Sequence, residues 1–377
     1  MNDQNNPLKK SICHLSSVHP YFDSRIFYKE CRSLAADGYP VRFVARKEDG
    51  QPITVDGVDI IPFREYPNRC KRILFSPFSM FALARRQKAH IYHFHDPELL
   101  PVGMLLKLIG KKVIYDVHED YSQQLLHKYW LKSTLLKQII AGSFHVFEVI
   151  ASLFFDRIVT ATDDIAENFP ASRTVTIRNL PVLRTINEAP PVPLKKEKPV
   201  LIYAGALARV RGVKEVIQAV ELLKNDVELL LLGKWESDTY RAECENLAGW
   251  QKVKYLGLKK PHEVYGYMKA ADIGLSLLYP ISNYLTSLPV KAFEYLACGL
   301  PMVMSNFKYW QEIFAGCAVF TDPSVPQTIA EQIDLLLDNP QERQRLRQAG
   351  LDLVHHQYSW EAEHKRLLEM VHQLTVK

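Results

Sequence analysis

Apolar residues are grouped along the first half of the chain in short runs of strand length, separated by stretches with helical spacing. The strand-like runs cover 11–18, 41–45, 90–95, 112–116 and 157–161. Between the first two runs, apolar positions repeat over 24–37 with the period of a helix, which a glycine ends. Strands that alternate with helices predict a parallel sheet with helices on both faces.

This pattern stops at residues 183–199, LRTINEAPPVPLKKEKP, where four prolines stand among 17 residues and no apolar period is visible. Such a composition is typical of a linker between domains. The alternation then starts again. Strands are predicted at 200–203, 228–232, 253–256 and 273–277, with a helix over 213–223.

We therefore predict an α/β protein with two doubly wound, Rossmann-like parallel-sheet domains that face a central cleft. The N-terminal domain is expected over 1–185 and the C-terminal domain over 195–357. The last segment, 358–377, has the spacing of an amphipathic helix and is expected to cross back to the first domain. Open α/β sheets bind ligands at the carboxyl ends of their strands, which places the expected site in the cleft.

Composition narrows the classes of function. The net charge of +5 is too small to predict a nucleic-acid partner, and the residues form no known nucleic-acid-binding module. The six cysteines include no CxxC pair, which favours a reducing compartment. The most apolar stretches, 99–110 and 144–155, are shorter than the about 20 residues of a membrane span. We expect a cytoplasmic protein without an export signal or transmembrane helix.

The most specific chemistry lies in residues 282–301, SNYLTSLPVKAFEYLACGLP. The triplet at 288–290 predicts a helix start, and Gly299 predicts its end. The first turn of a helix leaves backbone N–H groups unpaired and attracts phosphate, and Lys291 adds positive charge there. One turn further, the Glu294 carboxylate offers two acceptors to a vicinal diol such as a ribose. These groups predict a cradle for a nucleoside diphosphate.

At these residues the sequence resembles the GT-B glycosyltransferases of family 4. Their signature is two glutamates separated by seven residues and followed by an Ala/Cys-Gly-x-Pro turn. Glu294 matches the second glutamate, which in the family holds the donor ribose, while Thr286 stands at the first position. Residues 205–212, GALARVRG, resemble the family's glycine-rich basic loop, with Arg211 at the basic position. The similarity extends in order over 10–375.

The resemblance implies roles for residues in both domains. The donor side is expected to comprise Gly205, Lys234, Gly257, Thr286, Ser287, Leu288, Val290 and Glu294. The expected catalytic groups are His118, Arg209, Arg211 and Lys291. The acceptor side and its cleft loop are expected to comprise His19, Asp23, Arg25, Asp96 and Glu119. These last residues fall in the segments HPYFDSR, HFHD and DVHE, which match the family's cleft-facing loops.

The resemblance further implies a retaining transfer of a sugar from a UDP- or GDP-sugar to a hydroxyl of a glycan or polyprenyl-linked acceptor, in cell-surface polysaccharide synthesis. Cations would stabilise the departing diphosphate, so no cofactor and no metal ion is expected. His118 would orient the sugar or polarise a hydroxyl. Two alternatives stay open: a nucleotide-sugar epimerase on the same fold, and a donor-binding scaffold without turnover, which Thr286 and Ala206 suggest because the family has other residues there.

Ordinary structural interpretations exist for many of these residues. Glu294 fits an amphipathic helix, and Asp23 can pair with Arg25 at a helix start. A metal site could be suspected from residue type alone, because several histidines and aspartates lie in or just after neighbouring predicted strands: His93, His95, Asp96, Asp116 and His118. We expect these side chains to form hydrogen bonds at strand ends instead.

Residues 64–88 contain seven basic side chains interleaved with aromatic and aliphatic ones. Ser76 and Pro77 predict a helix start, so the segment predicts a basic amphipathic helix. One interpretation is docking on an anionic membrane surface, which apolar residues of 129–155 would extend. The other is a helix packed on the core with a solvated rim.

Overall fold

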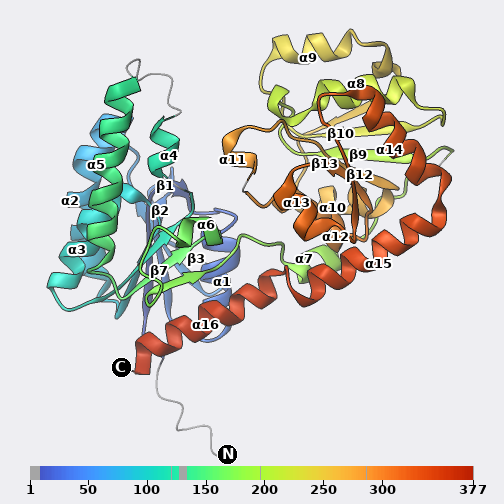
Figure 1. Cartoon of the computed structure of the whole chain (residues 1–377). Coiled ribbons are helices and arrows are strands. Elements are labelled where there is room, and N and C mark those ends of the chain that lie inside the picture. Colours follow the sequence, from blue (N-terminus) through green and yellow to red (C-terminus); the bar gives the residue numbers. More distant parts are fainter. Residues whose placement is uncertain (1–8, 120, 127–133, 196, 286, 377) are drawn as a thin grey trace, which may run out of the picture. The chain divides into compact units, whose positions relative to one another are not determined.

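The computed structural model describes residues 9–119, 121–126, 134–195, 197–285 and 287–376. The chain divides into two compact units (Figure 1). The first unit contains Met1–Asn179 and Glu363–Lys377, and the second contains Leu180–Ala362. Each unit is a sheet of parallel strands covered by helices, as the alternating pattern predicts.

The sheet of the first unit has eight strands in the order β3-β4-β2-β1-β5-β6-β7-β8, all parallel except the β3–β4 pair. The strands are β1 Ile12–Pro20, β2 Val41–Arg46, β3 Ile53–Val55, β4 Val58–Phe63, β5 Ile91–Phe94, β6 Lys112–Val117, β7 Arg157–Thr160 and β8 Thr174–Thr176. The helices are η1 Ile26–Cys31, α1 Arg32–Ala36, α2 Arg69–Gln87, η2 Pro97–Leu99, α3 Leu100–Leu108, α4 Tyr121–Leu126, α5 Thr134–Ser152, α6 Asp163–Ala166 and most of α16 Trp360–Val376.

Successive residues of the central strands point to opposite faces of this sheet. Cys13, Leu15 and Phe94 pack into the apolar core beneath α2 and α3. Between them, His14 and His93 point to the other face, toward the π-helix η1. Both faces of β1 and β5 are buried, so these strands show no alternation of polarity in the sequence.

The sheet of the second unit has six parallel strands in the order β11-β10-β9-β12-β13-β14. The strands are β9 Val200–Ala204, β10 Glu228–Leu232, β11 Val253–Gly257, β12 Ile273–Ser276, β13 Met302–Ser305 and β14 Ala318–Thr321. The helices are α7 Leu183–Glu188, η3 Arg209–Arg211, α8 Val213–Leu222, α9 Asp238–Glu245, η4 Ala248–Lys252, α10 Pro261–Ala270, α11 Ser282–Leu285, α12 Val290–Ala297, α13 Lys308–Phe314, α14 Pro326–Asp338 and α15 Pro340–His356. Separate apolar cores cover the two faces of the sheet.

The structure differs from the predicted organisation at the linker. Residues 183–199 belong to the second unit, and the division falls between 179 and 180. The first part of this stretch forms α7, where Ile186 is fully buried. Further on, the Val192 N–H donates to the Gly266 carbonyl in α10 at 3.0 Å. The proline-rich segment is thus packed on the second unit rather than forming a free linker between the two units.

Two expectations about helices need correction. The helix α2 begins at Arg69, not at Ser76, because the Asn68 side chain accepts a hydrogen bond from the Lys71 N–H at 2.9 Å and caps the helix there. Pro77 lies inside this helix. The first nine residues of the apolar stretch at 144–155 belong to the longer helix α5, which ends at Ser152. Within α5, Leu135–Ser152 is long and apolar enough to span a bilayer, and 22% of that window is buried.

Candidate functional site

Three strand ends of the second unit are joined closely at the carboxyl edge of the sheet. The Gly205 N–H donates to the Leu232 carbonyl, and the Gly233 N–H donates to the Gly257 carbonyl, both at 2.9 Å. A Cβ atom on Gly233 would lie 1.7 Å from the Gly205 carbonyl oxygen, and the φ of Gly233 is 145°. Only glycine permits this approach. The predicted donor residues Gly205 and Gly257 therefore share one edge.

Of the two predicted loop arginines, Arg211 is the one beside this edge. Its Nη1 lies 3.8 Å from the position of a Cβ on Gly205, next to the Tyr203 ring. Burial raises the pKa of Tyr203 to about 12, and the Arg211 charge opposes that rise. Arg209 is engaged elsewhere, since it pairs with Glu243 and its guanidinium lies over the Tyr240 ring.

The helix α12 begins at Val290, and Pro289 at its N-cap provides no side-chain hydrogen bond to the first turn. Lys291 Nζ pairs with Glu294 Oε2 at 2.5 Å, so the predicted phosphate and ribose ligands lie together. The Tyr265 hydroxyl donates to Glu294 Oε1 at 3.2 Å, a contact that no sequence signal indicated.

The surroundings of α12 are fixed by two further contacts. The Trp310 Nε1–H donates to the Ser287 carbonyl at 2.9 Å and holds the segment before the helix. The Ala204 N–H donates to the Tyr295 hydroxyl at 3.0 Å and ties α12 to the end of β9. Leu288 is half-buried and Lys234 is exposed. Thr286 lies outside the described residues.

A polar cluster occupies the end of β6 in the first unit. Asp116 Oδ2 lies 3.0 Å from both His95 Nδ1 and His118 Nε2. Arg25 Nη2 donates to Asp116 Oδ1 at 3.0 Å. Burial raises the pKa of Asp116, but the charge of Arg25 and the contacts with His118 and His95 together outweigh it and hold that pKa well below its usual range. Burial lowers the pKa of His95 to about 4, so a neutral imidazole faces an ionised carboxylate.

The predicted acceptor-side residues differ in their burial and in the groups that they contact. Arg25 is 4% exposed and donates to the Ile177 carbonyl at 2.9 Å, so it is a buried positioning residue rather than a cleft contact. Asp96 is also buried, and it accepts from the Ser17 N–H at 2.6 Å. Asp23 accepts from the backbone N–H of Arg25 at 2.8 Å and so fixes the entry to η1.

Among the predicted site residues of the first unit, His19, His118 and Glu119 are at least partly exposed. The His19 ring centroid lies 5.4 Å from that of His118, which is 18% exposed. Burial lowers the pKa of His19, but the hydrogen bond to Asp23 and the charge of Asp96 outweigh it and raise that pKa. Glu119 is exposed. His118 and His19 thus present a polar patch at the strand ends.

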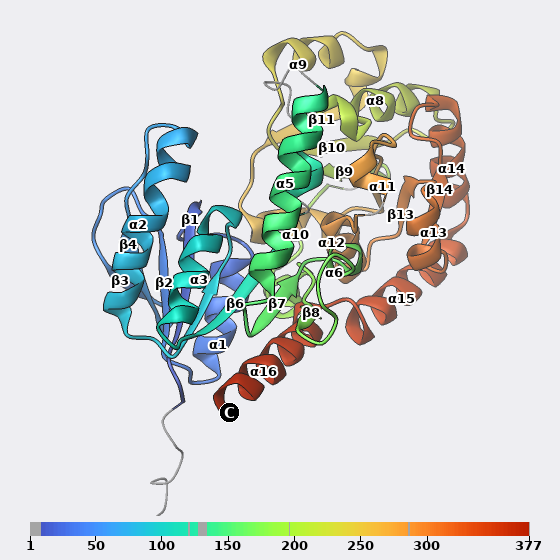
Figure 2. The ribbon, with the colours of Figure 1, turned by 60° about the vertical axis from the view of Figure 1, so that its left-hand side comes forward.

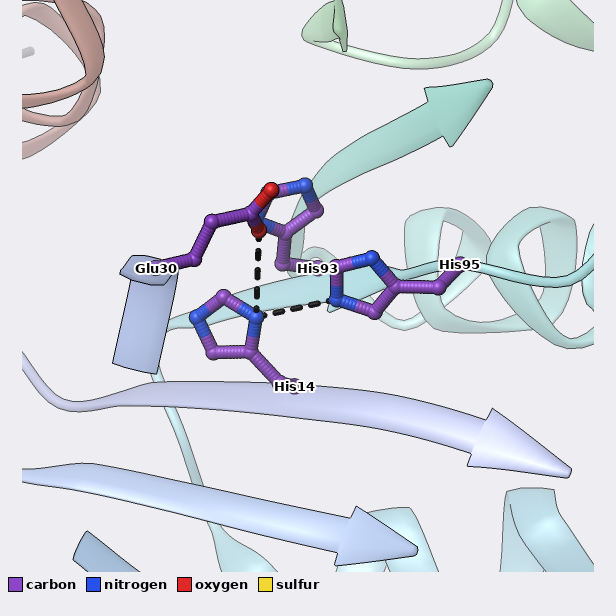
Figure 3. Close-up of side chains that lie close together, drawn as sticks. All are labelled: His14, Glu30, His93 and His95. Atoms are coloured by element: carbon purple, nitrogen blue, oxygen red, sulfur yellow. Dashed lines mark hydrogen bonds and ion pairs between the residues drawn. The ribbon is translucent and has the colours of Figure 1, made fainter. Parts of the chain in front are cut away.

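Sequence reasoning missed His14 and Glu30, which complete a buried cluster with His93 and His95 (Figure 3). Burial raises the pKa of Glu30 well above its usual range and lowers that of His14 and His93 well below theirs. A signal was present, because His14 and His93 are register partners on neighbouring strands. It became visible only once the pairing of the strands was known.

The fold of two parallel-sheet α/β units is that of the GT-B glycosyltransferases. Sucrose-phosphate synthase from Thermosynechococcus elongatus matches with a TM-score of 0.74 and 18% identity, over 98% of this chain and 100% of that chain. HepE from Anabaena in complex with UDP-glucose matches with a TM-score of 0.71 and 13% identity, over 97% of this chain and 100% of that chain.

The family described as glycosyl transferases group 1 matches residues 185–352, and the glycosyl transferase 4-like domain matches residues 24–182. The chain is therefore a glycosyltransferase that combines a glycosyl transferase 4-like domain with a group 1 glycosyltransferase domain. O-antigen chain mannosyltransferase B of Escherichia coli is 28% identical over 209 residues, which are 52% of this chain and 53% of that protein. Spore coat protein SA of Bacillus subtilis is 24% identical over 186 residues, 46% of this chain and 48% of that protein. The chain spans about half the length of the curated relatives it matches.

Proposed function

We propose that this protein transfers a sugar, with retention of configuration, from a UDP- or GDP-sugar to a hydroxyl of a glycan or polyprenyl-linked acceptor, at the cytoplasmic face of the cell membrane. The observation that carries the proposal is the edge of the second unit that holds Gly205, Arg211 and the uncapped start of α12. The backbone N–H groups in the first turn of a helix and the guanidinium beside Gly205 are groups that favour a diphosphate. Glu294, one turn into α12, is the partner for the ribose diol.

The neighbours support a nucleotide-sugar donor. HepE structures are described with UDP and with UDP-glucose, and the Escherichia coli relative is an O-antigen chain mannosyltransferase. In the proposed transfer the bond from the anomeric carbon to the diphosphate breaks, and the acceptor oxygen bonds to that carbon on the same face. The departing diphosphate oxygen takes the acceptor proton. His118 orients the sugar, and Asp116 fixes its imidazole at 3.0 Å.

We further propose that the diphosphate needs no divalent cation, because Arg211 and Lys291 supply positive charge where negative charge develops. A panel of UDP-, GDP- and dTDP-sugars, screened by thermal shift and donor turnover in EDTA, should identify one donor that is bound and consumed. Activity lost in EDTA and restored by Mg²⁺ or Mn²⁺ would contradict the metal-independent transfer. Sugar interconversion without acceptor would instead identify an epimerase, and binding without turnover a scaffold.

The apolar surface of the first unit supports a membrane-facing role. α2, α3 and α5 lie next to one another on one side of the sheet (Figures 1 and 2). On α2, Phe78 is 75% exposed, and on α3, Leu108 is 76% exposed. A groove of about 560 Å³ is lined by Cys70, Ile73, Leu74, Pro77, Phe78, Phe81, Pro101 and Leu105. Arg85 and Arg86 are exposed in the last turn of α2. Apolar side chains beside basic ones suit the interface of an anionic bilayer.

Charge reversal tests this surface. The double variant Arg85→Glu/Arg86→Glu should lose most of its co-sedimentation with vesicles that contain anionic lipid, because each basic residue near such a surface contributes about 1 kcal/mol. The matched control Lys224→Glu/Lys308→Glu makes the same charge change at two exposed lysines of the second unit and should sediment like the wild type. Equal binding by both double variants would exclude the proposed surface.

A further inference from the structure

Three histidines and one glutamate converge inside the first unit, on the face of the sheet that η1 covers (Figure 3). His14 projects from β1, His93 from β5, His95 follows the end of β5, and Glu30 projects from η1. One nitrogen or oxygen atom of each side chain lies within 4.8 Å of those of the other three. We call these four residues the His₃Glu cluster.

Within the cluster, His14 Nδ1 and His95 Nε2 are in direct hydrogen-bond contact, whereas both distances to the Glu30 carboxylate are longer. Glu30 Oε2 lies 3.9 Å from His14 Nδ1 and 3.8 Å from His93 Nδ1, beyond the about 3.2 Å of a good N–H···O bond. The ligands of a tetrahedral zinc ion, with bonds of about 2.0–2.1 Å, are about 3.3 Å apart. His14 Nδ1 and His95 Nε2 are 3.0 Å apart. The two distances to Glu30 are therefore longer, and the His14–His95 distance shorter, than the ligand separation around one tetrahedral metal ion.

The cluster also holds polar atoms without partners. All four side chains are buried, with exposed fractions from 0% to 3%. Among the residues that the structure describes, neither ring nitrogen of His93 has a hydrogen-bond partner. The cluster-facing nitrogen of His14 is Nδ1, which contacts His95 Nε2, whereas its unpartnered Nε2 is the other ring nitrogen. Buried polar groups are normally paired, so nitrogen lone pairs left open in a core call for a ligand.

Outer contacts already orient two of the four side chains. Asp116 Oδ2 lies 3.0 Å from His95 Nδ1, an arrangement that places the proton on Nδ1 and leaves the Nε2 lone pair facing the cluster. Arg25 Nε lies 3.1 Å from Glu30 Oε1, whereas the contacts to His14 and His93 are made by the other oxygen, Oε2. Metal-ligating histidines and carboxylates are held by outer partners in this way.

We propose that the His₃Glu cluster binds one Zn²⁺ ion in a closed, structural site. Imidazole nitrogens suit zinc, whereas Mg²⁺ and Ca²⁺ prefer oxygen ligands. Four protein ligands complete a tetrahedral shell and leave no position for a substrate. The ion would connect β1, η1 and β5. The site is separate from the diphosphate edge of the second unit and does not depend on the proposed transfer.

A second set of candidate ligands, His95, Asp116 and His118, needs no ion. Its distances from the Asp116 carboxylate to the two imidazoles are ordinary hydrogen bonds of 3.0 Å. Asp116 Oδ1 also accepts from Arg25 Nη2 at 3.0 Å, so both oxygens of this carboxylate are already hydrogen-bonded. Because His118 belongs only to this second set, a substitution of His118 tests the second set separately from the His₃Glu cluster.

Metal analysis of the full chain tests the proposal. Protein incubated with ZnCl₂ and then washed with EDTA to clear surface ions should retain about one zinc per chain, measured by mass spectrometry. His14→Gln and His93→Gln should each lose it, and the matched variant His118→Gln should retain it. Wild-type protein without zinc would overturn the proposal, as would zinc that is lost from His118→Gln but kept in the other two variants.

Cobalt gives a readout that requires no variant to fold. Wild-type protein prepared without zinc and given Co²⁺ should show the intense visible absorption of four-coordinate cobalt, which zinc abolishes by displacement. Weak bands typical of six-coordinate cobalt would overturn the proposed ligand set. Zinc should also raise the unfolding temperature of the first unit, because an ion that binds only the folded state stabilises it; an unchanged transition would contradict a site in that core.

Discussion

Replacing Gly233 with alanine is expected to destabilise the second unit by at least about 3 kcal/mol and to abolish binding of the donor. The new Cβ would lie 1.7 Å from the carbonyl oxygen and 2.8 Å from the carbonyl carbon of Gly205. Both atoms belong to the backbone, so no side chain can rotate away to relieve the overlap. The φ of 145° is also a conformation that alanine rarely adopts. Relief requires the loops after β9 and β10 to separate, which moves the edge proposed to hold the diphosphate.

Gly316→Ala is the matched control, since it makes the same chemical change in the same unit. A Cβ on Gly316 would meet no atom within 4 Å, and its φ lies outside the left-handed region. Calorimetric unfolding should show the transition of the second unit lowered by about 6–12 °C in Gly233→Ala and nearly unchanged in the control. Equal transitions in the two variants would show that the loops separate at little cost, contrary to the close packing described here.

The central strands of both sheets were predictable because they are buried and end at clear signals. The runs at 41–45, 112–116 and 228–232 correspond closely to β2, β6 and β10. The strands β3, β4, β8, β13 and β14 were not predicted. Of these, β3 and β8 have three residues each, none of them fully buried, which is too few to establish a period.

The sheet edge that we propose to hold the donor was predictable to the extent that it depends on chain position. Parallel strands end at a common edge, so glycines that follow strands, such as Gly205 and Gly257, are expected to lie together. The sequence does not indicate which charged side chains form pairs in the folded protein. Arg25 donates to a carboxylate 91 residues away, and Arg209 pairs with Glu243, which lies on a different helix. Such partners are decided by side-chain packing between elements.

The His₃Glu cluster was missed for a related reason. A strand buried on both faces has no polar side by which a histidine can be assigned, so His14 reads as an ordinary strand residue. Glu30 has the spacing of a helical residue and gives no sign that it is fully buried. Only the register of β1 with β5 brings His14 beside His93 and shows that the polar residues share a face.

Glu294→Ala is expected to weaken binding of the nucleoside diphosphate about tenfold or more, a loss of about 1.4 kcal/mol or more, measured by calorimetry. The carboxylate stands one turn into α12, pairs with Lys291 at 2.5 Å and accepts from the Tyr265 hydroxyl at 3.2 Å. Those contacts hold it in one orientation, so two acceptor oxygens are already arranged for a ribose diol. Alanine removes both acceptors and leaves Lys291 without its partner. The unfolding temperature should stay close to that of the wild type, because the Lys291 side chain is 32% exposed and can turn to solvent once its partner is removed.

The matched control is Glu331→Ala, which removes an exposed carboxylate from α14 of the same unit and changes the net charge equally. It should bind UDP or GDP, whichever the donor panel selects, like the wild type. Glu294→Gln keeps one oxygen acceptor and should lose less affinity than alanine, whereas a role limited to pairing with Lys291 predicts equal losses. Affinity unchanged in Glu294→Ala would mean that the ribose is held elsewhere, and with it the proposed orientation of the nucleotide along the start of α12 would fail.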